Sequence, residues 1–142
     1  MDKLLVSACL LGTPCRYDGK SKTDAQVCAL AEKYELIPVC PEQLGRLPTP
    51  RTPSERQGGR VVTADGRDVT DAYRRGAEAA LALCREHGCT AAVLKEKSPS
   101  CGCGKIYDGT FSRRLTDGDG VTAALLMENG VRVYGESSLE GL

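Results

Sequence analysis

Short apolar runs alternate with longer amphipathic stretches along this chain. The apolar runs predict buried strands at Lys3–Ala8, Glu35–Val39, Ala91–Lys95 and Val131–Tyr134. Between them, apolar residues recur at spacings of three and four, which predicts helices from Thr23 or Asp24 to about Tyr34, from about Ala72 to His87, and from Gly120 to Gly130. Strands that alternate with helices are typical of an α/β domain with a mostly parallel sheet. We therefore expect one three-layer domain over residues 1–142, with helices on both faces of the sheet.

Three further segments qualify this picture. Arg60–Thr63 and Arg67–Thr70 flank an Ala-Asp-Gly sequence and predict a small β-hairpin. The Pro- and Arg-rich stretch 43–57 reads as a long connection without regular structure, and such loops are often functional. We expect residues 135–142 to form a loose polar tail.

A Tyr-Asp-Gly sequence occurs twice, at Tyr17–Gly19 and at the start of Tyr107–Phe111. Asp and Gly in succession favour a tight turn. The repetition indicates shared turn chemistry, without evidence for duplication of a larger unit.

Composition limits the classes of partner. The 19 basic residues balance the 19 acidic ones, and there are only five Tyr, one Phe and no Trp. Both features argue against a protein that binds nucleic acid through a basic surface or a stacking platform. The chain has no signal-like start and no apolar stretch of membrane-spanning length, so we expect a cytoplasmic protein with no membrane partner and reduced thiols.

The chain has eight cysteines, and their positions relative to the predicted strands and helices divide them into candidate ligands and structural residues. Cys9, Cys40 and Cys101 each follow a predicted strand, and parallel strands bring their carboxyl ends to one edge of the sheet. We therefore expect these three thiols to converge. The remaining cysteines divide into three that we interpret as structural, Cys28, Cys84 and Cys89, and two whose role stays open, Cys15 and Cys103.

Three thiolates fit catalytic zinc with a bound water, or a [4Fe-4S] cluster with one iron open to a ligand. A site of buried or reactive thiols without metal is the alternative. Glu42 lies two residues beyond Cys40 and is either a general acid/base beside the metal or a solvated loop carboxylate. Ser98 and Ser100 either cap the next turn or donate hydrogen bonds to a substrate. His87, the only histidine, ends a helix, which disfavours a histidine-based zinc site.

Several motifs together resemble the thiouracil desulfidase family, a bacterial domain family long classed as of unknown function. The similarity spans nearly the whole chain and rests on Val6–Gly12, Arg16–Gly19, Val39–Glu42, Gly45–Arg51 and Lys97–Gly102. The resemblance implies an oxygen-sensitive [4Fe-4S] cluster held by Cys9, Cys40 and Cys101, with the fourth iron free of protein ligands. One departure is Cys103, a second thiol two residues from Cys101 that can compete for the open iron.

The resemblance also implies an activity: non-redox desulfuration of a small thiolated nucleobase such as 2-thiouracil. In this hypothesis Glu42 transfers the proton, Ser98 activates the substrate, and Ser100 with Arg51 or Arg46 helps to bind it. Water attacks the thiocarbonyl carbon, and sulfide leaves on the open iron. The alternatives are a non-catalytic iron–sulfur or zinc protein for sensing or delivery, and a metal-free thiol enzyme. The physiological substrate and the oligomeric state stay open.

Overall fold

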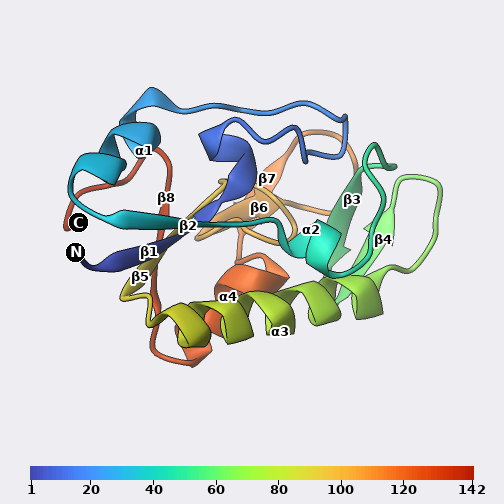
Figure 1. The fold of residues 1–142 in the computed structure, drawn as a ribbon. Helices are drawn as coiled ribbons and strands as arrows, with labels where there is room; N and C mark the ends of the chain where they lie inside the picture. Colours follow the sequence, from blue (N-terminus) through green and yellow to red (C-terminus); the bar gives the residue numbers. More distant parts are fainter.

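A parallel four-stranded sheet forms the centre of the protein, for which a computed structural model describes residues 1–142 (Figure 1). The spatial order of its strands is β2-β1-β5-β8, and every neighbouring pair is parallel. The strands are β1 (Lys3–Ser7), β2 (Glu35–Val39), β5 (Ala91–Leu94) and β8 (Arg132–Gly135). The predicted parallel α/β fold is confirmed, and each predicted strand lies within one or two residues of its observed bounds.

Side chains of alternate residues feed two separate cores, one on each face of the sheet. Leu5 packs on one face with residues of α3 (Thr70–His87) and α4 (Val121–Glu128). Leu4 and Val6 pack on the other face with Val27 of α1 (Ala25–Ala29). Period-two alternation within a strand produces this division. Figure 1 shows the resulting layers, with α3 and α4 on one side of the sheet and α1 on the other.

Two helix starts are set by aspartates. Asp24 caps α1, because its carboxylate accepts the Val27 N–H at 3.0 Å. That helix is shorter than predicted and tightens into a 3₁₀ turn over Leu30–Glu32. The predicted capping of α3 by Thr70 or Asp71 is wrong: Thr70 is the first helical residue, and Asp68 accepts its N–H at 2.9 Å.

The predicted hairpin is correct in its first strand only. Strand β4 (Arg60–Thr63) pairs with β3 (Ser54–Gln57) across Gly58-Gly59, whereas residues 67–70 contribute a single bridge between Val62 and Asp68. Stretch 43–57 is therefore partly structured: it begins with the last two residues of the short helix α2 (Pro41–Leu44) and ends with β3. A second hairpin, β6 (Lys105–Tyr107) with β7 (Leu115–Asp117), was not predicted.

Residues 136–142 lie against the sheet and do not form the loose tail that the sequence suggested. The Glu136 carboxylate accepts the Glu96 N–H at 2.6 Å and pairs with Lys95 Nζ at 2.9 Å. Leu139 and Leu142 pack against the core on the α1 face. These contacts attach the end of the chain to the loop that follows β5.

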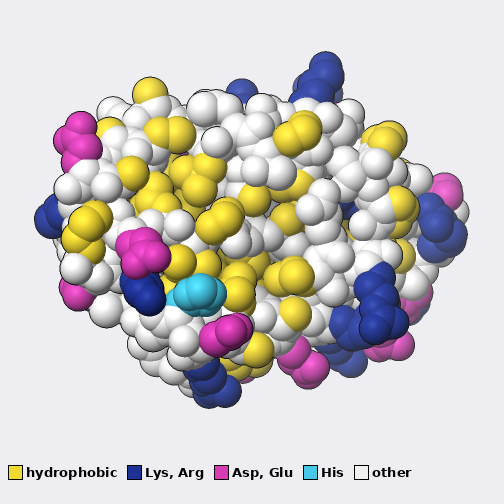
Figure 2. All heavy atoms as spheres, viewed as in Figure 1, with side chains coloured by type: hydrophobic (Ala, Val, Ile, Leu, Met, Phe, Trp, Pro, Cys, Tyr) yellow, Lys and Arg dark blue, Asp and Glu magenta, His cyan; other side chains and the backbone are white.

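One face of the molecule shows where the types of side chain gather (Figure 2). Hydrophobic side chains gather over the middle of the face seen in Figure 2, where β2 and α3 lie, and charged side chains lie mostly at its margins. None of the helices combines the length and the apolarity that crossing a membrane requires.

Candidate active site

The strand order creates a crevice at one end of the sheet. The chain moves outward from β1 to β2 in one direction and to β5 and β8 in the other, so β1 and β5 flank the switch point. Ligands of open α/β sheets bind at the carboxyl ends of strands beside such a point. A cavity of about 570 Å³ opens there and is lined by residues that follow β1, β2 and β5. This is the candidate active site.

The structure brings the three predicted thiols to this cavity. Cys9 lies in the 3₁₀ turn Ala8–Leu11 after β1, Cys40 caps the start of α2 after β2, and Cys101 lies in the loop after β5. Cys9 and Cys101 are buried, and Cys40 is half-buried. Three residues that are far apart in sequence therefore share one site because parallel strands end at the same edge.

Cys15 is a fourth thiol in the same cavity. Its side chain is buried, and the Cys40 thiol donates to its carbonyl oxygen at 3.8 Å. Hydrogen bonding to Cys40 lowers the pKa of Cys15, but a contact with Cys9 and burial outweigh it and raise the pKa to about 11. The sequence left Cys15 open because it lies within a loop, and only the folding back of that loop places it beside Cys9 and Cys40.

Cys103 points elsewhere. Its thiol donates to the Val133 carbonyl at 3.8 Å, and it is not among the residues that line the cavity. The Gly102 between it and Cys101 sits in a tight turn, where an added Cβ would lie 2.8 Å from the Ser98 carbonyl oxygen. That turn separates the two thiols of the Cys-Gly-Cys sequence.

The metal-free thiols hold their protons strongly. Burial raises the pKa of Cys101, and the nearby Glu42 charge adds to the effect. The hydrogen bond to Cys15 raises the pKa of Cys40, with burial and Glu42 acting in the same direction. Cysteine binds metal as the thiolate, so metal binding here would release the thiol protons. The positive charge of the metal would then compensate the negative charge of the buried thiolates.

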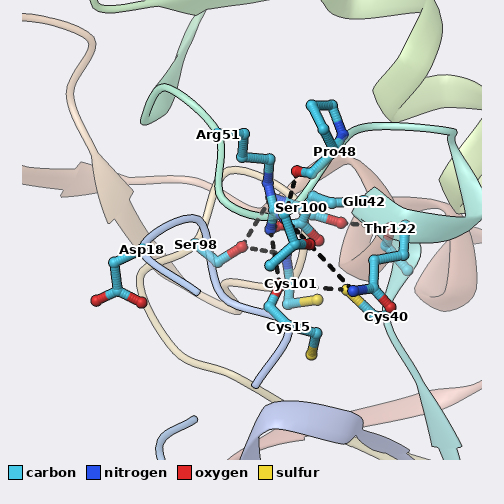
Figure 3. Close-up of polar contacts among 12 residues, drawn as sticks. Cys15, Asp18, Cys40, Glu42, Pro48, Arg51, Ser98, Ser100, Cys101 and Thr122 are labelled. Atoms are coloured by element: carbon cyan, nitrogen blue, oxygen red, sulfur yellow. Dashed lines mark hydrogen bonds and ion pairs between the residues drawn. The ribbon is translucent and has the colours of Figure 1, made fainter. Parts of the chain in front are cut away.

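Glu42 and Arg51 form a buried ion pair at the cavity wall. Arg51 Nη2 lies 3.4 Å from Glu42 Oε2, and the two side chains are 7% and 14% exposed. Arg51 also donates to the carbonyls of Cys15, at 3.2 Å, and Pro48, at 3.3 Å (Figure 3). Burial raises the pKa of Glu42, and the Arg51 charge partly opposes this. Arg51 thus ties the Cys15 loop to the helix that carries Glu42.

Two glycines determine how closely that helix lies against α3. An added Cβ would lie 2.1 Å from the Ala72 carbonyl oxygen at Gly45 and 2.0 Å from the Pro41 carbonyl oxygen at Gly76. Real Cβ atoms do not approach so closely, so the backbones of α2 and α3 meet only because both positions lack a side chain. This backbone contact positions Glu42.

The two candidate serines occupy different places. Ser98 lines the cavity, and its Oγ accepts the N–H groups of Ser100 and Cys101, each at 3.0 Å. Ser100 is fully buried below the cavity wall, with its Oγ 2.8 Å from Thr122 Oγ1. Ser98 is thus the serine placed to meet a ligand. Arg46 does not line the cavity, and His87 is the last residue of α3.

The donor set fits a [4Fe-4S] cluster by its chemistry, because the three predicted ligands are all thiols. No three His, Cys, Asp or Glu side chains converge on a point as a single metal ion requires. In a [4Fe-4S] cluster each cysteine binds a different iron, so the thiols line a larger volume instead of meeting at one atom. The thiols of Cys9, Cys40 and Cys101 come from three strand ends and line a cavity of about 570 Å³, which is the arrangement that cluster ligands have.

Fold and site together define a doubly wound α/β protein with a cysteine-lined pocket at its switch point. A family profile described as 2-thiouracil desulfurase matches residues 4–138, and the chain belongs to this family. It is 44% identical to the uncharacterized protein YbbK of Bacillus subtilis (strain 168), over 98% of this chain and 99% of that protein. Among solved structures it is similar to the [4Fe-4S]-dependent thiouracil desulfidase TudS, with 50% identity, a TM-score of 0.92, and coverage of 98% of this chain and 93% of that one.

Proposed function

We propose that this protein is an iron–sulfur-dependent enzyme that removes sulfur from a thiolated nucleobase such as 2-thiouracil, without net electron transfer. The observation that carries the proposal is the meeting of Cys9, Cys40 and Cys101 with Glu42 in one cavity. The 50% identity to a [4Fe-4S]-dependent thiouracil desulfidase supports the same reading. The reaction is a cleavage of a C–S bond by water.

Cys9, Cys40 and Cys101 would hold the [4Fe-4S] cluster, and one iron would carry no protein ligand. When bound, this cluster supplies a Lewis-acidic, sulfur-binding iron. Cys15 is not assigned as a ligand, although its thiol lies in the same cavity. The chain's own residues provide the proton transfer and the orientation of the substrate.

Glu42 serves as the proton-transfer group. Its carboxylate lines the cavity and takes a proton from the attacking water. Arg51 holds Oε2 of this carboxylate, and the Gly45–Gly76 backbone contact holds its helix. Because the Arg51 guanidinium already bonds to Glu42 and to two loop carbonyls, we propose that it positions Glu42 and the Cys15 loop in addition to any contact with the substrate.

Ser98 supplies a hydrogen bond to the substrate. Its Oγ already accepts two backbone N–H groups, which leaves the hydroxyl proton to be donated into the cavity. Ser100 acts beneath it, because its bond to Thr122 attaches the Cys101 loop to α4. The cytoplasmic location, the small-molecule substrate and the lack of nucleic-acid or membrane partners remain predictions from the sequence.

Anaerobic cluster reconstitution followed by a sulfide-release assay tests this function. Absorbance and iron content report the cluster, and 2-thiouracil, 4-thiouracil and a thiolated nucleoside serve as substrates. We expect sulfide and the oxygen-containing base in equal amounts, and no product from chelator-treated protein. A full cluster without turnover of any thiolated base would instead indicate a non-catalytic iron–sulfur protein for sensing or delivery. Activity that survives chelation and exposure to air would indicate a metal-free thiol enzyme.

A further inference from the structure

Aromatic residues are scarce in this chain, yet most of them lie at one place. The sequence has five Tyr, one Phe and no Trp. Four of these six line the candidate active site: Tyr17, Tyr73, Tyr107 and Phe111. Tyr17 is 43% exposed and Phe111 is 36% exposed, so both of these lining residues are accessible from solvent. Such a concentration is unexplained by cluster binding or by proton transfer.

The repeated Tyr-Asp-Gly sequence accounts for two of these rings. In the first copy the Asp18 carboxylate accepts the Lys20 N–H, and in the second the Asp108 carboxylate accepts the Thr110 N–H, both at 3.0 Å. In both copies the glycine has a positive φ, 75° in the first and 92° in the second. The two copies therefore form the same kind of Asp-capped turn, and each turn brings its tyrosine to the cavity.

A buried carboxylate holds the second turn. Glu55 of β3 is 8% exposed, and its Oε1 accepts the N–H groups of Gly109, at 2.9 Å, and Phe111, at 3.2 Å. Gln57 donates to the Gly109 carbonyl at 2.9 Å. Phe111 itself has a φ of 56°, which is unfavourable for a residue with a side chain. Unfavourable backbone held by buried contacts is typical of ligand-binding segments.

We propose that Tyr17, Tyr107 and Phe111 form an aromatic clamp that binds the flat face of the substrate ring, and that Glu55 is a positioning residue for this clamp. The clamp selects planar, aromatic rings over puckered rings that carry the same carbonyl groups. Rings of this kind stack on aromatic side chains with little dependence on their substituents. The proposal rests on the proposed function for the identity of the ring, but it concerns binding and not the cleavage of sulfur.

Comparing the binding of uracil with that of 5,6-dihydrouracil distinguishes ring stacking from the other contacts of the base. Both carry the same two carbonyls and lack sulfur, but only uracil is planar and aromatic. Equilibrium dialysis with the cluster-loaded protein measures Kd for each. We expect the parent to prefer uracil, and Phe111→Leu and Tyr17→Leu to weaken uracil binding by roughly fivefold to 100-fold, the range for loss of a stacked base. Dihydrouracil binding should change little.

Glu55 is tested by rescue. Glu55→Gln keeps an oxygen that accepts the two N–H groups and should retain the preference for uracil, whereas Glu55→Ala should lose it. Glu78→Ala, at an exposed position of α3 that does not line the cavity, is the matched control. Equal binding of both rings by the parent, no binding of either, or equal losses in the variants would overturn the clamp. Sulfide release from 2-thiouracil on the same preparations tests the proposed function separately.

Discussion

The eight cysteines form two groups of four that differ in what surrounds the sulfur. One group lines the cavity at the carboxyl edge of the sheet and consists of Cys9, Cys15, Cys40 and Cys101. The other group behaves as ordinary core or loop residues. Cys28 donates to the Leu10 carbonyl at 3.6 Å, Cys84 to the Cys89 carbonyl at 3.9 Å, and Cys103 to the Val133 carbonyl at 3.8 Å, while Cys89 packs against the core.

This comparison shows that topology, and not spacing along the chain, decides which thiols line the cavity. Cys101 and Cys103 are separated by one glycine and belong to different groups, whereas Cys9 and Cys101 belong to the same group from opposite parts of the chain. The strand ends bring distant residues together, and the tight turn at Gly102 separates near ones.

The largest expected effect is loss of the cluster when one of its three proposed ligands in the first group is removed. Replacing Cys9, Cys40 or Cys101 singly with Ala should abolish the visible absorbance of the reconstituted cluster, because two thiolates hold a cubane poorly. Anaerobic absorbance and iron analysis measure this.

Variants of the second group provide the control. Cys28→Ala and Cys84→Ala should keep the cluster and cost at most about 1–2 kcal/mol in the free energy of unfolding. A normal cluster in Cys40→Ala would remove the distinction between the two groups.

The next effect concerns chemistry within the same cavity. Glu42→Gln keeps the size of the side chain but removes its ability to take a proton. Cluster content should stay near that of the parent, while sulfide release per cluster should fall by about 10²-fold or more. Anaerobic turnover on matched preparations measures the ratio.

Glu78→Gln is the control for Glu42→Gln, because Glu78 is exposed on α3 and does not line the cavity. Turnover of Glu42→Gln at the parental rate per cluster would leave Glu42 as a wall residue only, with the proton acceptor elsewhere.

A smaller loss is expected at Ser98. Ser98→Ala removes one hydrogen bond to the substrate, which corresponds to roughly 1–3 kcal/mol in the transition state. It also removes the acceptor for two backbone N–H groups. Ser98→Thr keeps the hydroxyl and should recover most of the activity per cluster, which separates the hydroxyl from the shape of the loop. Failure of Thr to rescue turnover, with the cluster intact, would argue against the hydroxyl.

The sequence predicted the parallel sheet well because its strands are apolar runs with few alternatives. Ala91–Leu94 is buried at every position, and a run of this kind fits only the middle of a sheet. The convergence of three thiols followed from that sheet alone. These predictions depend on local patterns that have a single physical explanation.

The missed parts depend on contacts between distant residues. Strand β3 reads Ser-Glu-Arg-Gln, which has no residue type that favours a strand, and its buried Glu55 is satisfied by a loop more than fifty residues away. Cys15 reaches the cavity because its loop folds back: the Lys22 N–H donates to the Cys9 carbonyl, and the Asp24 N–H donates to the Leu10 carbonyl. Neither contact leaves a periodic signal in the sequence.

Cys15 and Cys103 give the smallest expected effect and the finest test of the comparison. Both are thiols close in sequence to an assigned ligand, but only Cys15 lies in the cavity. Ser is nearly isosteric with Cys and binds iron poorly, so each Cys→Ser variant asks whether that sulfur is needed. Cluster content should stay near the parent value in both variants, because three assigned ligands remain.

The two variants, Cys15→Ser and Cys103→Ser, test different alternative sets of cluster ligands. Loss of the cluster in Cys15→Ser, with retention in Cys101→Ser, would move the ligand set to Cys9, Cys15 and Cys40, because Cys15 contacts both of the other two. Loss in Cys103→Ser, with retention in Cys101→Ser, would mean that the turn at Gly102 rearranges when the cluster binds. Retention in both variants, together with loss in Cys101→Ser, leaves Cys101 as the only thiol of the post-β5 loop that the cluster requires.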